Sequence, residues 1–298
     1  MGTKLNTPQP TDGLPFVDVH CHLPWTEGRS NPRLPTPEKQ LEEFRAAGGQ
    51  FLITSSIDLN SAIIMLEFCK KHDEVHLACG MAPQTVTYTQ EEKYQADFEK
   101  WKSFVEKNLD SILCFGEIGL DFHHAKTVEK RKKQIKELKN IISFLDGKGK
   151  PIELHVRNAG PRDQDHQNPA HPYNDGDSAT RNILKILKQF KISPEKVMFH
   201  CYSGPNSMNQ ELAGMGFTFS IPSSSFGFGK WNKIAKNLPL EQVVTETDSP
   251  FQHPYIMKPV NVPSNARYAI ATLAHLNQEK QENVAKIVLE NAKMFFKL

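Results

Sequence analysis

Eight short apolar segments recur along this 298-residue chain, and most are separated by segments with helical periodicity. The apolar segments predict strands over 16–20, 51–54, 75–81, 112–116, 151–155, 196–200, 216–220 and 242–248. Helices are predicted over 37–47, 61–71, 91–107, 127–145, 179–191 and 264–296. Alternating strands and helices indicate parallel βαβ units, and eight such units close a barrel. We therefore expect a single (β/α)₈ TIM barrel domain in the α/β class, with an open doubly wound sheet as the structural alternative.

The boundaries of this domain follow from composition. Residues 1–15 form a polar leader and 16–298 the barrel, which a polar insert at about 160–178 interrupts. The leader lacks the apolar region of a secretory signal, and no apolar run reaches the length of a membrane span. Five scattered cysteines favour reduced thiols, and a net charge of +2 excludes a strong sequence-blind attraction to nucleic acid. We expect a soluble monomer, cytoplasmic or nuclear, without membrane contact.

Residues that commonly bind metals fall at the carboxyl ends of five predicted strands. They are His20 and His22, Glu117, His155, His200 and Asp248. A strand alternates its side chains, so His20 and His22 share one face while Cys21 points away. In a barrel these strand ends meet at one face, where active sites are built. Any one of these residues could be a satisfied polar group, but together they predict a site for one or two divalent metals.

Several ordered segments then suggest a family. VDVHCHL, CFGEIGLDF, ELHVRNA, FHCYSG and TETDSPF, with NVP and NAKMFF near the end, resemble the TatD-type metal-dependent deoxyribonucleases of the amidohydrolase superfamily. The resemblance runs from Phe16 to Phe296. It implies a TIM barrel with two divalent metal ions (Mg, Mn or Zn) that hydrolyses phosphodiester bonds. It also implies DNA as the partner, as single strands or 3′ ends, with nucleotides commonly removed from the 3′ ends as a 3′–5′ exonuclease does.

The same resemblance implies roles for the six residues. His20 and His22 correspond to ligands of the first metal, and His155 and His200 to ligands of the second. Glu117 corresponds to the bridging carboxylate. Asp248 corresponds to a ligand that also accepts the proton of the attacking water, so Glu117 and Asp248 are the expected catalytic pair. Two cations suit this reaction because they activate water and offset the charge of the attacking and leaving oxygens.

Other residues have two interpretations each. We expect substrate contacts from Arg157, Tyr202 and Ser203. The alternative for Arg157 is a salt-bridged surface arginine, and the alternative for Tyr202 and Ser203 is that they only shape the loop after the strand. Asp121 and Glu246 are expected to support the ligands or to have purely structural roles. The basic cluster Lys130–Lys133 either contacts DNA or forms a solvated helix face. A run of aromatic residues either stacks on bases or packs under the barrel mouth; it consists of Phe226, Phe228 and Trp231. His123, His124, His166 and His171 line the mouth or lie in exposed loops.

Two departures from the family pattern affect substrate choice. Relatives usually carry Gly-x-His-Pro after the third strand, where this chain has Gly80-Met81-Ala82-Pro83. The insert at 160–178 could act as a lid or be a surface loop. Two other functions therefore stay open: an amide or lactone hydrolase on the same barrel, and an inactive metal-binding scaffold.

Overall fold

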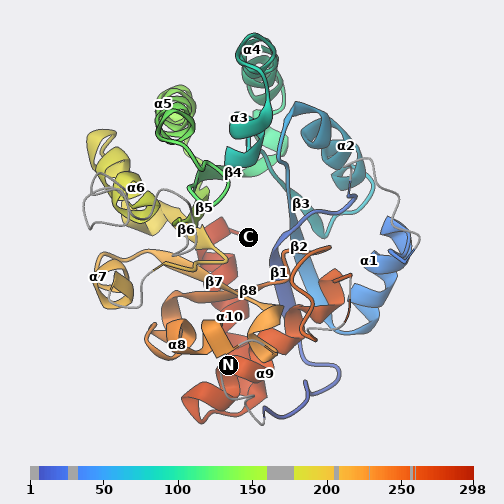
Figure 1. Ribbon diagram of the computed structural model, residues 1–298. Coiled ribbons are helices and arrows are strands. Elements are labelled where there is room, and N and C mark those ends of the chain that lie inside the picture. Colours follow the sequence, from blue (N-terminus) through green and yellow to red (C-terminus); the bar gives the residue numbers. More distant parts are fainter. Residues whose placement is uncertain are drawn as a thin grey trace.

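The computed structural model describes residues 7–25, 33–159, 178–204, 208–227, 229–255, 258 and 260–298. Its strands surround a central axis, with the helices arranged outside them (Figure 1). The strands are β1 (Phe16–Cys21), β2 (Gly49–Ser55), β3 (Val75–Ala78), β4 (Ile112–Asp121), β5 (Ile152–Arg157), β6 (Val197–His200), β7 (Thr218–Pro222) and β8 (Val243–Glu246). They pair in chain order, each parallel to the next.

The helices connect successive strands and cover the outside of the sheet. They are α1 (Pro37–Ala46), α2 (Leu59–Cys69), α3 (Pro83–Tyr88), α4 (Glu91–Lys107), α5 (Val128–Leu145), α6 (Ala179–Gln189), α7 (Asn209–Gly214), α8 (Gly229–Lys236), α9 (Arg267–Asn277) and α10 (Gln281–Phe296). Local signals start several of them: Pro37 occupies the first turn of α1, and Asp58 caps α2 in a reciprocal pair with Ser61.

The barrel closes between its last and first strands. The backbone N–H of Asp248 donates to the carbonyl oxygen of His20 at 2.9 Å, and that of His22 donates to the carbonyl oxygen of Ser249 at 2.8 Å. Cys21 and Ser249 form a parallel bridge at the same level. This closure places the segment after β8 directly beside the end of β1.

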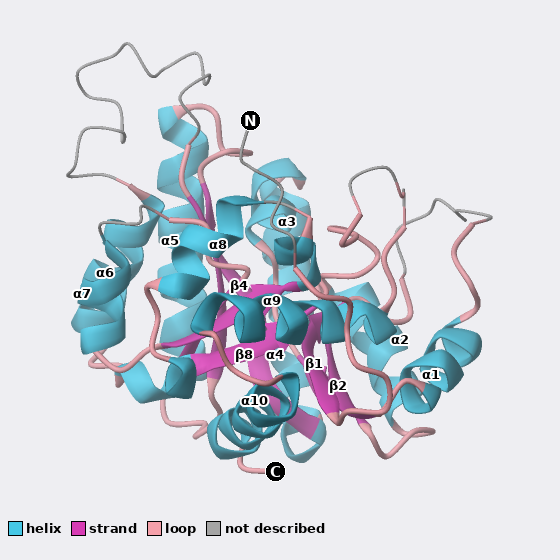
Figure 2. Ribbon diagram, turned by 90° about the horizontal axis from the view of Figure 1, so that it is seen from below, coloured by secondary structure: helices cyan, strands magenta, loops and turns pink. Residues whose placement is uncertain are grey.

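Two apolar layers hold the barrel together. The larger one lies between the sheet and the surrounding helices. The smaller one fills the barrel interior, where Val17, Val19 and Val244 meet Leu289 and Phe296 of α10. Figure 2 places α10 across the end of the strands. Since Val17 lies near the start of β1, α10 covers the amino-terminal end of the barrel, and the carboxyl end is left for the site.

The predicted TIM barrel is confirmed, and the differences lie in the element bounds. Strands β4 and β5 extend past Glu117 and His155, so these two residues lie inside strands, and Asp248 lies two residues beyond β8. The prediction missed α3, α7 and α8, because helices of six to eight residues contain too little periodicity to detect. Residues 160–177 of the expected insert lie outside the described residues. In the described ranges, none of the helices combines the length and apolar character needed to cross a membrane.

Gly119 of β4 pairs with His155 of β5, and we expect its replacement by alanine to destabilise the fold strongly. A Cβ at this position would lie 1.9 Å from the carbonyl oxygen of His155. The free energy of unfolding should fall by at least about 3 kcal/mol in urea titrations. Gly147→Ala is the control, because a Cβ there meets nothing within 4 Å, and its left-handed φ of 75° predicts a loss of only about 1 kcal/mol. Equal losses for the two variants would contradict this packing argument.

Candidate metal centre

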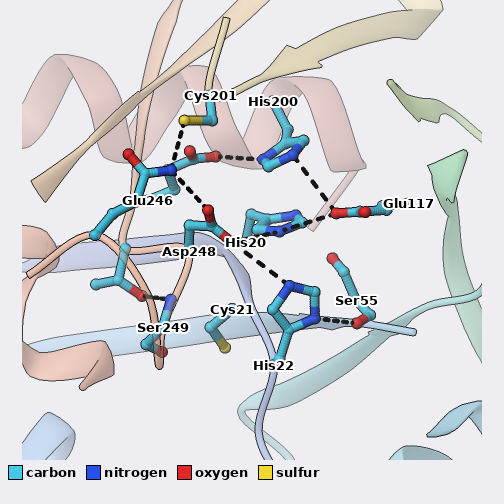
Figure 3. A network of polar contacts seen from close by, with 12 residues as sticks. His20, Cys21, His22, Ser55, Glu117, His200, Cys201, Glu246, Asp248 and Ser249 are labelled. Carbon is cyan, nitrogen blue, oxygen red and sulfur yellow. Dashed lines mark hydrogen bonds and ion pairs between the residues drawn. The ribbon is translucent and has the colours of Figure 1, made fainter. Parts of the chain in front are cut away.

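The two histidines at the end of the first strand both face Asp248 (Figure 3), and His22 lines a cavity. His20 belongs to β1, and His22 follows directly after its last residue. Cys21 points away from both, and its thiol donates to the carbonyl oxygen of Ile53 at 3.4 Å. The alternation predicted from the sequence therefore holds at this strand end.

Two acidic side chains face these imidazoles. Glu117 is held inside β4, where its backbone N–H donates to the carbonyl oxygen of Ser56 at 3.2 Å. Asp248 comes from the segment that closes the barrel and adopts a left-handed φ of 55°. The two carboxylates thus reach the same point from different sides of the barrel.

His20 lies between the two carboxylates. Its Nε2 is 3.5 Å from Oε2 of Glu117 and 3.4 Å from Oδ1 of Asp248. Nε2 of His22 is 3.5 Å from the same Asp248 oxygen. On this side of the cavity, two imidazole nitrogens and two carboxylate oxygens face one another.

The remaining two histidines also face Glu117. Nε2 of His200 is 3.5 Å from Oε2 of Glu117, and Nδ1 of His155 is 3.7 Å from Oε1. These two imidazole nitrogens are 3.1 Å apart. Glu117 therefore faces His20 of β1 as well as the two histidines from β5 and β6, and the rings of His20 and His200 stack with their centroids 3.8 Å apart.

Three of the four imidazoles have a hydrogen-bond acceptor at their outer ring nitrogen. Nδ1 of His20 meets the carboxylate of Glu153, Nδ1 of His22 meets the carbonyl oxygen of Ser55 at 2.7 Å, and Nε2 of His155 meets the Asp121 carboxylate at 3.0 Å. Nδ1 of the fourth, His200, lies 3.4 Å from the Glu246 carboxyl group without a hydrogen bond to it. An acceptor there favours the proton on that nitrogen and leaves the lone pair of the other directed at the centre. This is the usual arrangement of metal-binding histidines.

A divalent cation fits this cluster. Two groups each have ligand atoms within 4.8 Å of one another, namely His20, His22 and Asp248, and His20, Glu117 and His200. Nε2 of His20 is buried and, within the residues that the structure describes, has no hydrogen-bond partner. A cation would give this nitrogen a partner and would balance the facing carboxylates.

The charge states follow from burial and from these contacts. Burial lowers the pKa of His200 to about 3, so this imidazole is neutral and able to bind a metal at neutral pH. Burial also raises the pKa of Glu246 to about 8. For Asp248, burial alone would raise the pKa, but the contacts with His20 and His22 outweigh it and hold the pKa well below the usual range. Asp248 is therefore ionised.

A cavity of about 870 Å³ opens above the cluster and includes Glu117, His155, His200 and Asp248 in its wall. Arg157 and Ser203, two expected substrate contacts, also line it. Tyr202 does not reach the cavity. Its ring is fully buried against Phe199 and Phe219, because apolar packing under the strand ends holds it there. The structure therefore places Tyr202 beneath the strand ends, outside the cavity wall.

The supporting carboxylates have clear positions. Oδ2 of Asp121 accepts from His155 and, at 2.8 Å, from Nδ1 of His124, which brings His124 into the cavity wall. Glu246 lies behind His200, as expected for a support. Glu153, fully buried, was not predicted. The available signal was an acid inside an apolar strand, two residues before His155 and therefore on the same face.

The basic cluster is divided between the protein interior and the surface. Arg131 is buried and donates to the carbonyl oxygen of Ala125 at 2.8 Å, while Lys133 pairs with Glu91 at 3.1 Å. Lys130 and Lys132 are exposed on the same helix. Phe226 packs on Tyr255 and Tyr268, and Trp231 is 6% exposed at the cavity wall. His166, His171 and Phe228 lie outside the described residues.

Comparisons with known proteins agree with this geometry. Residues 17–297 match the family model described as "TatD related DNase". An uncharacterized metal-dependent hydrolase of Methanocaldococcus jannaschii is 28% identical over 285 residues, which cover 95% of this chain and 97% of that protein. Deoxyribonuclease TATDN3 of Homo sapiens is 27% identical over 296 residues, which cover 96% of each chain. The crystal structure of a TatD homologue from Escherichia coli K12 has the same fold, with a TM-score of 0.74 at 19% identity over 95% of this chain and 98% of that one.

Proposed function

The chain belongs to the TatD-related DNase family of metal-dependent hydrolases, and on that premise we propose that it hydrolyses phosphodiester bonds in DNA. Its substrate would be single-stranded DNA, from which it removes nucleotides at the 3′ end. One observation supports this proposal most: four imidazoles, three of them held by an acceptor at the outer ring nitrogen, surround the carboxylates of Glu117 and Asp248 under an open cavity.

In this proposal the cluster holds two divalent metal ions. His20, His22 and Asp248 would hold the first, and His155 and His200 the second, with Glu117 shared between them. When bound, such ions make water more acidic and neutralise the negative charge that makes a phosphodiester resist attack. Mg, Mn and Zn all suit a mixed histidine and carboxylate set.

Side chains of the protein would accept a proton and bind the phosphate of the substrate. Asp248 is ionised and lines the cavity, so its carboxylate can accept the proton of the attacking water. Arg157 lines the same cavity from the end of β5, and its exposed guanidinium can donate two hydrogen bonds to phosphate oxygens. Ser203 can donate one more from the loop after β6.

The test is hydrolysis of a 3′-labelled single-stranded oligonucleotide by chelator-treated protein, with and without added Mg²⁺, Mn²⁺ or Zn²⁺. We expect release of 3′ nucleotides only when metal is present. An ester or amide substrate run in parallel separates the competing functions. Intact DNA with hydrolysis of an amide or lactone would replace the nuclease by a hydrolase of the other class. Metal uptake without hydrolysis of any substrate would indicate a scaffold.

Replacing Glu153 with glutamine should weaken metal binding about 10- to 100-fold. The substitution keeps the shape of the side chain but removes the charge that holds the Nδ1 proton of His20. Titration calorimetry with Mn²⁺ would measure the loss. Glu99→Gln, an exposed change on α4, is the matched control and should bind as wild type does. Unchanged affinity in Glu153→Gln would show that Glu153 does not orient His20.

A further inference from the structure

Two aromatic side chains at the edge of the cavity have no part in the proposed chemistry. Trp25 and Phe251 both line the cavity, with their ring centroids 5.1 Å apart and their planes at 90°. Phe251 is 47% exposed, so about half of its surface is not covered by protein. The exposed face of this ring is available to a ligand inside the cavity.

The pair is attached to the segments that carry the metal-site residues. Trp25 comes three residues after His22, and Phe251 comes three residues after Asp248. A backbone hydrogen bond of 2.8 Å from the N–H of Phe251 to the carbonyl oxygen of Asp248 fixes the second spacing. The ring of His22 is 5.5 Å from that of Trp25 and 6.1 Å from that of Phe251. The aromatic pair therefore lies next to the metal site, within the reach of one sugar.

We propose that Trp25 and Phe251 form a stacking platform for the nucleobase of the nucleotide whose phosphate lies at the metal site. This inference rests on the proposed nuclease function and adds the subsite that binds the base. A nucleotide joins its phosphate to a flat aromatic base through one sugar, so a base platform must lie beside the phosphate site. Every base has a π-face, so such a platform binds all four bases and discriminates little among them.

The platform also favours an unpaired base at a strand end. In a duplex the faces of a base are covered by its neighbours, so Phe251 can stack only on a base that has left the helix. The cavity volume of about 870 Å³ is that of a small-molecule pocket, which takes in a strand end more readily than a duplex. Arg157 and His124 line the same cavity and can offer polar contacts to the rest of the strand.

The experiment compares Phe251→Leu with wild type on two oligonucleotides, one ending in an adenine nucleotide and one in an abasic sugar. Leucine keeps an apolar side chain but removes the π-face. We expect KM for the adenine end to rise about 5- to 100-fold in Phe251→Leu, with kcat changed much less, and KM for the abasic end to rise far less. Phe251→Tyr should restore the wild-type KM, because tyrosine keeps the ring.

The controls separate this inference from the proposed function. Urea midpoints of the variants should match wild type, since Phe251 is half exposed. A KM that rises equally for both ends, or for neither, would overturn the platform while leaving the nuclease function standing. Failure of the wild type to hydrolyse either oligonucleotide in any metal would overturn the proposed function and this inference with it.

Discussion

Asparagine at position 248 is expected to lower kcat for DNA hydrolysis by at least about 1,000-fold while the protein stays folded. The carboxylate of Asp248 lies 3.4 Å from His20 and 3.5 Å from His22, where it would both bind metal and accept the proton of the attacking water. An amide has nearly the same shape but carries no charge and cannot accept that proton.

Asparagine is the right substitution here because of the backbone. Asp248 has a left-handed φ of 55°, a conformation that strains asparagine less than alanine. Loss of activity in Asp248→Asn can therefore be assigned to the carboxylate. The control is Asp146→Asn at the carboxyl end of α5, an exposed change that should keep full activity. Wild-type kcat in Asp248→Asn would remove this residue from the reaction.

Glutamine at position 117 is expected to reduce bound metal to less than about half of the wild-type content and kcat/KM by about 1,000-fold or more. Oε2 of Glu117 lies 3.5 Å from both His20 and His200, and Oε1 lies 3.7 Å from His155. Because one carboxylate serves both halves of the cluster, its neutralisation should weaken both metal positions.

Metal content after reloading with Mn²⁺ would measure this effect directly. Glu241→Gln, an exposed change before β8, is the matched control and should retain the wild-type content. If Glu117→Gln bound as much metal as wild type, a bridging role for Glu117 would be excluded.

The barrel could be predicted from the sequence because each strand is marked by its own short apolar run, and this pattern recurs along the chain. Parallel strands buried on both faces read as short apolar runs, and β1 is buried along its whole length. The cluster of metal-binding residue types could be predicted because the barrel topology brings strand ends together, wherever they lie in the chain. Only the structure shows which imidazole nitrogens face which carboxylate oxygens.

The parts that sequence analysis missed depend on contacts between distant segments. Glu153 lies on β5 and meets His20 on β1 across the barrel interior, which no local pattern encodes. Trp25 and Phe251 meet because β8 closes onto β1, so neither is prominent in its own segment. Tyr202 had the expected position after His200, but apolar packing with Phe199 and Phe219 decided where its ring lies.

The central claim is that this chain holds divalent metal between the ends of β1 and β4–β6 and the segment after β8. Elemental analysis of protein that has been stripped with a chelator, reloaded with Mn²⁺ and freed of excess metal tests it most directly. We predict about two ions per chain. Metal at the level of the stripped protein after reloading would contradict the account, because the facing imidazoles and carboxylates would then not form a metal site.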